Sequence, residues 1–286
     1  GYKSLGYDIS ISGGGWVENL LDCISNNKNL EIFSLFYTRL CKEIKFKKID
    51  NITYIALPEK GKNIIKCNKK MIDDLKKVVN LTKPDLVHII GTEREYNYRL
   101  AEIVGFNKVI ASITGLVSII EKHYYGGIEE KHFNVLSFAD IIRKAGPKNE
   151  RKNFQKNAFF EKKLLSSINY VMGRTTWDYA CVKQINPNIN YYYCGEIINP
   201  LFSKYKWKLD KCISHRIFIS QGSYPLKGLH KFLEAFPIIL KEFPDSEVYI
   251  GGPNILKSNK LIDRIKRTTY AKYILKIIKK NKINIS

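Results

Sequence analysis

Residues Arg216–Asn254 read RIFISQGSYPLKGLHKFLEAFPIILKEFPDSEVYIGGPN, and this segment is the clearest indication of the fold class. The short apolar run Ile217–Ser220 predicts a strand, and the glycines and proline after it predict a loop. The apolar spacing of Leu229–Glu242 predicts a helix, and Glu247–Ile250 predicts a second strand that ends at Gly251-Gly252. Strand, helix and strand in this order form a βαβ unit with parallel strands.

The same rhythm of short apolar runs and helical periods extends toward the N-terminus. Predicted strands are Leu30–Tyr37, Asn51–Leu57, Leu86–Ile90, Val109–Ile113 and Tyr170–Gly173; predicted helices are one beginning near Gly15, Asn68–Leu81, Tyr96–Val104 and one capped by Thr175 or Thr176. The segment before Phe202 is turn-rich and then extended. The expected fold class is α/β with doubly wound parallel sheets, in which ligands bind outside the carboxyl ends of the strands.

Composition sets limits on the class of protein. The chain has 286 residues, 44% hydrophobic and 26% charged, which is typical of globular domains and excludes collagen or a disordered tail. No apolar run approaches the roughly 20 residues that cross a bilayer. None of the six cysteines forms a CxxC pair, and no histidine has zinc-finger spacing, so no metal site is expected.

The net charge of +21 is the unusual feature of the composition. Most of the excess is lysine, which is encoded by A/T-rich codons, so genome composition and an anionic partner both remain explanations. Base readers rely more on arginine, and no RRM, KH, helix-turn-helix or zinc pattern occurs. A nucleic-acid partner is therefore not expected.

Four motifs occur in a fixed order: Gly13-Gly14-Gly15-Trp16 opening a helix, His88–Glu93 after a strand, Gly173–Asp178, and Gln221–Gly228 followed by a helix and Tyr249–Gly252. In this order and spacing the sequence resembles the retaining GT-B glycosyltransferases of bacterial surface-polysaccharide synthesis. The resemblance implies two Rossmann-like domains facing each other across a cleft, with residues 1–200 as the acceptor domain and residues 201–286 as a partial donor domain. The first strand of the family and its later donor-domain half have no counterpart here, so we expect a fragment, a split gene or a truncated product.

The function implied by the resemblance is transfer of a sugar from a nucleotide-sugar donor to a glycan or lipid-linked acceptor. The nucleotide-sugar is a substrate, and no separate cofactor or catalytic metal is implied. The implied location is cytoplasmic, peripheral on the inner face of the membrane. The alternative is a non-catalytic remnant or partner subunit that binds membrane or acceptor.

The donor-phosphate residues implied by the resemblance lie in two glycine loops. Gly13, Gly14 and Gly15 precede a helix N-terminus, which favours bound anions, although a tight turn would also explain them. Gly222, Ser223 and Lys227 form the second set, with Lys227 offsetting charge on the leaving diphosphate. A solvated lysine is the alternative. In the family an arginine usually occupies the position of Gly222, so Arg174 or Arg216 is a candidate second catalytic cation.

Acceptor-side candidates follow the earlier strands. They are Glu93, Thr114, Gly115 and His123. Glu93 could instead favour the following helix N-terminus.

Three further polar residues have simpler interpretations. His88, inside an apolar strand, is interpreted as a satisfied core residue, and Asp178 is interpreted as a helix cap. Glu196 lies in the turn-rich and extended segment before Phe202, and it only partly matches the family pattern there.

Two basic segments hold most of the net charge. Residues 143–163 carry eight basic and two acidic residues, and residues 255–286 carry ten basic residues and one acidic residue. The first could sit on an anionic membrane, with Phe154, Phe159, Phe160, Leu164 and Leu165 inserted, or be a solvated helix. The second predicts a helix whose apolar face is left exposed.

Overall fold

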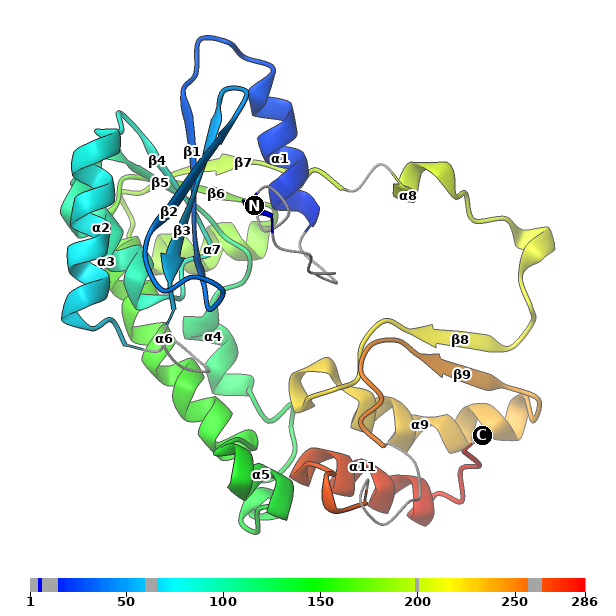
Figure 1. The fold of residues 1–286 in the computed structure, drawn as a ribbon. Helices are drawn as coiled ribbons and strands as arrows, with labels where there is room; N and C mark the ends of the chain where they lie inside the picture. Colours follow the sequence, from blue (N-terminus) through cyan, green and yellow to red (C-terminus); the bar gives the residue numbers. More distant parts are fainter. Residues whose placement is uncertain (1–4, 7–14, 60–65, 199–200, 257–263, 286) are drawn as a thin grey trace. The chain divides into compact units, whose positions relative to one another are not determined.

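The computed structural model describes residues 5–6, 15–59, 66–198, 201–256 and 264–285. The chain divides into two compact units. Unit 1 comprises Gly1–Ser118 and Lys156–Lys206, and unit 2 comprises Ile119–Gln155 and Trp207–Ser286. Each unit combines helices with parallel strands, so the fold is mixed α/β and compatible with a Rossmann-like architecture (Figure 1).

The described strands of unit 1 form two sheets. One has the order β1 (Ile32–Thr38), β3 (Ile52–Pro58), β2 (Lys45–Ile49), with β1 and β3 parallel and β2 antiparallel. The other is wholly parallel, in the order β4 (Val87–Ile90), β5 (Val109–Ser112), β6 (Tyr170–Gly173), β7 (Asn190–Tyr193). The carboxyl ends of β4 to β7 therefore lie at one edge of the sheet.

Helices connect these strands. They are α1 (Gly15–Ser25), α2 (Lys69–Thr82), α3 (Glu95–Val104), a 3-10 turn (Phe106–Lys108), α4 (Val117–Ile120), α6 (Pro147–Ser167), α7 (Thr176–Ile185) and α8 (Leu201–Lys204). The predicted limits of α2 are confirmed: the Asn68 side chain accepts a hydrogen bond from the backbone N–H of Met71, and the chain turns into the left-handed region at Lys83. The boundary between the two units falls within α6.

Two strands were not predicted. Every residue of β2 is exposed, so its sequence KFKKI lacks the alternation of a half-buried strand, and its pairing with β3 forms it. Strand β7, NYYY, lies in the segment predicted only as extended and pairs with β6.

The two faces of the β4–β7 sheet differ in burial. Ile89, Val109, Ala111 and Val171 share one face and are buried. His88 lies on the other face, is exposed, and its Nε2 is 2.7 Å from Ser112 Oγ. The interpretation of His88 as a core residue was therefore wrong, because strand alternation turns it away from the buried face.

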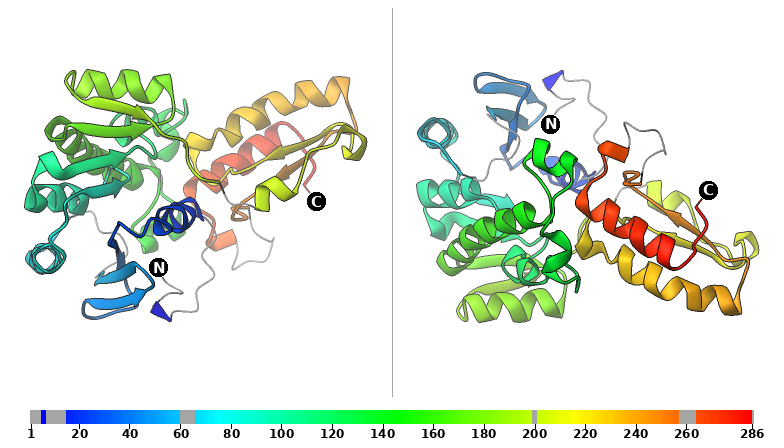
Figure 2. Two further views of the ribbon diagram at one scale, coloured as in Figure 1. Left: turned by 90° about the horizontal axis from the view of Figure 1, so that it is seen from above. Right: turned by 90° about the horizontal axis from the view of Figure 1, so that it is seen from below.

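Unit 2 holds the βαβ unit predicted from residues 216–254. Its elements are the 3-10 turns Glu121–His123, Glu130–Phe133, Leu209–Lys211 and Pro225–Lys227, the helices α5 (Phe138–Arg143), α9 (Leu229–Glu242) and α11 (Thr269–Lys280), and the strands β8 (Arg216–Ile219) and β9 (Glu247–Ile250). Strands β8 and β9 pair in parallel, with Ile217 opposite Val248. Helices α9 and α11 lie side by side on one face of this two-stranded sheet (Figures 1 and 2).

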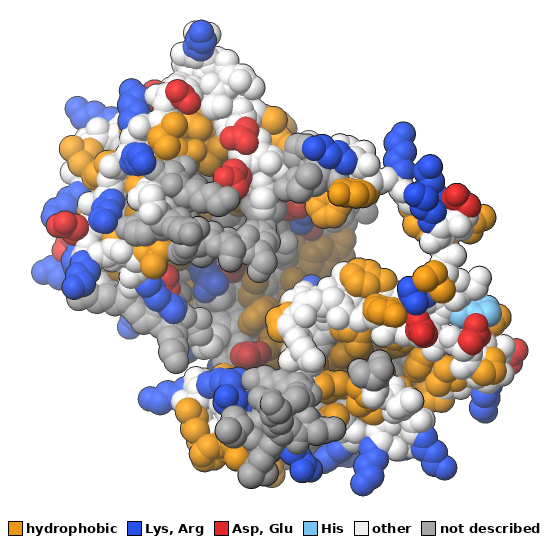
Figure 3. Space-filling model, turned by 45° about the vertical axis from the view of Figure 1, so that its right-hand side comes forward, with side chains coloured by type: hydrophobic (Ala, Val, Ile, Leu, Met, Phe, Trp, Pro, Cys, Tyr) orange, Lys and Arg blue, Asp and Glu red, His pale blue; other side chains and the backbone are white. Residues whose placement is uncertain are grey.

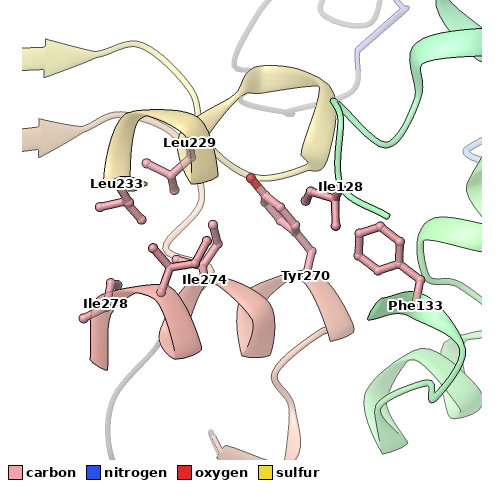
Figure 4. Close-up of a cluster of buried hydrophobic side chains, with 8 residues drawn as sticks. Ile128, Phe133, Leu229, Leu233, Tyr270, Ile274 and Ile278 are labelled. Atoms are coloured by element: carbon pink, nitrogen blue, oxygen red, sulfur yellow. The ribbon is translucent and has the colours of Figure 1, made fainter. Parts of the chain in front are cut away.

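The core of unit 2 lies between α9, α11 and the segment before α5 (Figure 4). Its buried side chains are Ile128, Phe133, Leu229, Leu233, Tyr270, Ile274, Ile277 and Ile278. The apolar face of α11 was expected to be exposed, and that expectation was wrong. It packs on α9 and on the 128–133 segment.

A buried polar network holds α5 to the start of α11. Asp140 Oδ2 accepts hydrogen bonds from the backbone N–H of Thr269 at 2.7 Å and from its hydroxyl at 2.6 Å. The Thr269 hydroxyl in turn accepts from the backbone N–H of Ser137 at 2.9 Å. These contacts place residues 119–155 in the C-terminal unit, whereas the sequence prediction grouped residues 1–200 together.

Basic side chains outnumber acidic ones on the face of the molecule that Figure 3 draws, and they alternate there with hydrophobic ones. In the part of the chain that the structure describes, no helix combines the length and apolarity needed to cross a bilayer.

Candidate functional site

The first candidate site is the loop between β8 and α9 in unit 2, which we call the glycine loop (residues 220–228). It begins where β8 ends and closes with a 3-10 turn at Pro225–Lys227. Gly228 takes a left-handed conformation, with φ of 73°, and leads directly into α9. The loop thus lies at the carboxyl end of a parallel strand, where doubly wound folds bind ligands.

Gly222 is required by packing. It is buried, and a Cβ at this position would lie 2.8 Å from Leu229 Cδ2. Gly251, after the neighbouring strand β9, is more tightly constrained, because a Cβ there would lie 2.8 Å from a backbone atom, the carbonyl oxygen of Ser220. Gly222 thus lets the end of β8 approach the start of α9, and Gly251 lets the end of β9 approach the end of β8. Ser223 follows Gly222 in the chain and precedes the 3-10 turn, and its hydroxyl lies 3.4 Å from Gln221 Nε2.

Lys227 is the cation of the glycine loop. Its side chain is exposed, and its Nζ lies 5.6 Å from the centroid of the Tyr224 ring. Among the described residues no carboxylate forms an ion pair with it, whereas Lys231, one turn later, pairs with Glu234 at 3.3 Å. Lys227 is thus an uncompensated positive charge next to a helix N-terminus, an arrangement that attracts anions.

The glycine loop rests on the segment around Gly126, which sequence analysis had not singled out. His230 Nε2 lies 2.9 Å from the carbonyl oxygen of Gly126, and a Cβ on Gly126 would lie 2.6 Å from the carbonyl oxygen of Pro225. Burial lowers the pKa of His230, so the neutral ring donates from Nε2. The adjacent pair Gly126-Gly127 was the signal in the sequence that could have indicated this close approach.

His123 belongs to the same segment of unit 2. It is exposed on the 3-10 turn Glu121–His123, and its carbonyl oxygen accepts a hydrogen bond from the N–H of Gly126 at 2.8 Å. The other acceptor-side candidates Glu93, Thr114 and Gly115 lie in unit 1.

The second candidate site is the carboxyl edge of the β4–β7 sheet in unit 1, which we call the strand-end cluster (Gly91, Glu93, Thr114, Gly115, Arg174 and Glu196). Arg174 follows β6, and its Nη2 donates to the carbonyl oxygen of Thr114 at 3.4 Å. Its Nη1 lies 2.5 Å from Glu196 Oε1, after the adjacent strand β7. The topology therefore brings together residues that are distant in sequence.

Glu93 projects over Gly91 within this cluster. Gly91 has φ of +83°, and a Cβ there would lie 3.0 Å from Glu93 Oε2 and 3.5 Å from Thr114 Oγ1. Glu93 Oε2 is buried and has no hydrogen-bond partner among the described residues. A buried carboxylate oxygen without a donor is unfavourable, so this position is suited to accept a hydrogen bond from a ligand hydroxyl.

Glu161 of α6 fixes the two loops that carry these residues. Its carboxylate accepts from the Thr92 hydroxyl at 2.7 Å, from the backbone N–H of Ser118 at 2.7 Å and from that of Val117 at 3.2 Å. Burial raises the pKa of Glu161 above its ordinary value. Its spacing in the sequence, three residues before the buried Leu164, was a signal that it faces inward.

The remaining predicted residues lie outside the two candidate sites or have structural roles. Gly15 is the first residue of α1, and Gly13 and Gly14 lie outside the described residues. The interpretation of Asp178 is confirmed: it forms a capping box with Thr175 at the start of α7.

The described residues contain no group of three or more His, Cys, Asp or Glu side chains that could hold a metal ion. No protein-family model matches the chain, and the curated proteins include no relative detectable by sequence.

Proposed function

We propose that the chain is the acceptor domain and part of the donor domain of a retaining glycosyltransferase, which moves a sugar from a nucleotide-sugar to a glycan or lipid-linked acceptor. The observation that carries the proposal is the glycine loop at the end of β8, with the exposed Lys227 at the start of α9, which forms no ion pair with a carboxylate of the described residues. A departing nucleoside diphosphate gains negative charge, and a fixed cation with a helix N-terminus stabilises that charge.

In this proposal the strand-end cluster of unit 1 contributes the second set of groups. The buried, donor-free oxygen of Glu93 accepts a hydrogen bond from an acceptor hydroxyl. Arg174, whose Nη1 lies 2.5 Å from Glu196 Oε1, is the cation of this cluster and its candidate catalytic residue. The resemblance of the ordered motifs to the GT-B family supports this assignment.

A panel of nucleotide-sugars tests the proposal through binding and diphosphate release. We expect one nucleotide class to bind, and Lys227→Ala to weaken that binding about 10- to 100-fold, since a charge-assisted contact is lost. Lys231→Ala is the matched control, because this lysine is also exposed, lies one turn later in α9 and pairs with Glu234. Absence of binding and of diphosphate release across the panel would sink the proposal.

The alternative function, a subunit that binds acceptor or membrane without catalysis, gives a different result in the same assay. It predicts acceptor or vesicle binding with no diphosphate release for any donor of the panel.

A further inference from the structure

A patch of exposed apolar side chains lies on unit 2 around α5. We call it the α5 patch; it consists of Val135, Phe138, Ile141, Ile142 and Ile265, which are 83%, 59%, 59%, 65% and 47% exposed. Phe138, Ile141 and Ile142 are spaced i, i+3 and i+4, so they share one face of the short helix. Apolar side chains gathered at this exposure mark a contact surface.

The fold holds these side chains outward. Ala139 and Asp140 of α5 are buried, and Asp140 accepts both hydrogen bonds from Thr269 at the start of α11. The helix therefore cannot rotate to cover Ile141 and Ile142 without breaking a buried polar network.

Basic side chains lie next to the α5 patch. One shallow hollow is lined by Phe138, Arg264, Ile265 and Lys272, and a second by Arg264, Arg267, Lys272, Leu275, Lys276 and Lys279. No acidic side chain of the described residues lines either hollow. The segments 135–144 and 264–280 together contain nine basic residues and one acidic residue, the buried Asp140.

We propose that the α5 patch docks on an anionic lipid bilayer, with Phe138, Ile141 and Ile142 at the boundary between headgroups and acyl chains. A surface with apolar side chains at its centre and lysines around it matches a bilayer, which is apolar inside and anionic at the headgroups. Pairing of two copies through this surface would bring the basic residues of the two neighbouring hollows together. The proposal does not depend on glycosyl transfer.

This surface differs from the one predicted at residues 143–163. Within α6, Leu164 and Leu165 are fully buried, and Phe154 and Phe160 stack on Tyr124 and Tyr98. Of the five apolar residues expected to insert, Phe159 is the exposed one, at 53%. The exposed apolar side chains next to this segment thus lie upstream, on α5.

Vesicle flotation of the full chain tests the proposal. We expect the protein to float with vesicles of phosphatidylcholine and phosphatidylglycerol and to remain below vesicles of phosphatidylcholine alone. Ile141→Ser with Ile142→Ser should lower partitioning at least about tenfold. Lys272→Gln with Lys276→Gln should lower it about fivefold per lysine at low salt, and less at high salt.

Two controls separate this surface from general basicity. Ile238→Ser removes an isoleucine of unit 2 that is 68% exposed on α9, and Lys162→Gln with Lys163→Gln removes two exposed lysines of α6; both should float like the parent protein. Equal loss in the controls, or unchanged flotation of the α5 variant, would overturn the proposal. Self-association of the parent that the α5 variant loses, without vesicle binding, would show instead that the patch pairs two copies. Nucleotide binding by the α5 variant should be unchanged, so failure here is distinct from failure of the proposed function.

Discussion

Arg174 and Glu196 form an ion pair across the ends of two adjacent parallel strands, with Nη1 and Oε1 2.5 Å apart. Their side chains are 33% and 32% exposed, so both remain open to a ligand. The pair orients the guanidinium and compensates its charge. An anionic ligand at Arg174 must therefore compete with Glu196.

Opposite effects are expected from changing the two partners. Arg174→Ala should lower kcat about 10²- to 10³-fold if Arg174 stabilises the leaving diphosphate, as proposed. Glu196→Gln should instead tighten binding of inorganic diphosphate, because it removes the competing carboxylate. Titration calorimetry at low and high salt measures the second effect, with the double variant as the reference. Full turnover by Arg174→Ala would exclude a catalytic role for this residue.

Gly126 and Gly127 provide a matched pair of substitutions next to the glycine loop. Both have positive φ, 60° and 87°, so alanine is strained at each. Only at Gly126 would the Cβ meet the backbone, 2.6 Å from the oxygen of Pro225; at Gly127 the nearest atom is Lys231 Cε at 3.6 Å. Gly126→Ala should destabilise unit 2 by about 1–3 kcal/mol more than Gly127→Ala and weaken nucleotide binding. Denaturant titration measures the difference, and equal losses would contradict the close approach.

Burial of His230 predicts a dependence of stability on pH. Because its pKa is lowered in the folded state, the stabilisation is complete above its ordinary pKa of 6.5 and is lost as pH falls through the lower, folded value. The free energy of unfolding of unit 2 should therefore fall on acidification by up to about 1.4 kcal/mol per pH unit. Hydrogen exchange of α9 and α11 amides measures this.

His230→Gln should remove that dependence, since the amide can still donate to Gly126 without titrating. His215→Gln changes an exposed histidine of the same unit and should leave the dependence in place. An unchanged pH profile in His230→Gln would show that another group is responsible.

The network of Asp140 and Thr269 predicts a measurable coupling. Asp140→Ala removes the oxygen that accepts from both Thr269 donors and leaves them buried without an acceptor, so it should destabilise unit 2 by about 2–3 kcal/mol. Thr269→Val keeps the backbone donor and should have a smaller effect. In a double-mutant cycle the two effects should fall short of their sum by at least about 0.5 kcal/mol. Additive effects would mean that the two side chains act independently.

Local patterns predicted many of the elements that form the two sites. Helix α9, Leu229–Glu242, and strand β9, Glu247–Ile250, have the predicted limits, because apolar periodicity and flanking glycine and proline are local signals. The polar strand β2 was missed, since it depends on pairing with β3.

The amino-acid sequence by itself determined the α/β class, the βαβ unit at residues 216–254 and the position of Lys227 at a strand-to-helix loop. Only the tertiary structure decided that residues 119–155 pack with the C-terminal unit, that Glu196 neutralises Arg174, and that α5 rather than α6 exposes its apolar side chains. The difference lies in the distance along the chain over which each interaction acts. Periodicity and turn chemistry act over a few residues, whereas ion pairs, buried networks and burial depend on which distant segments meet.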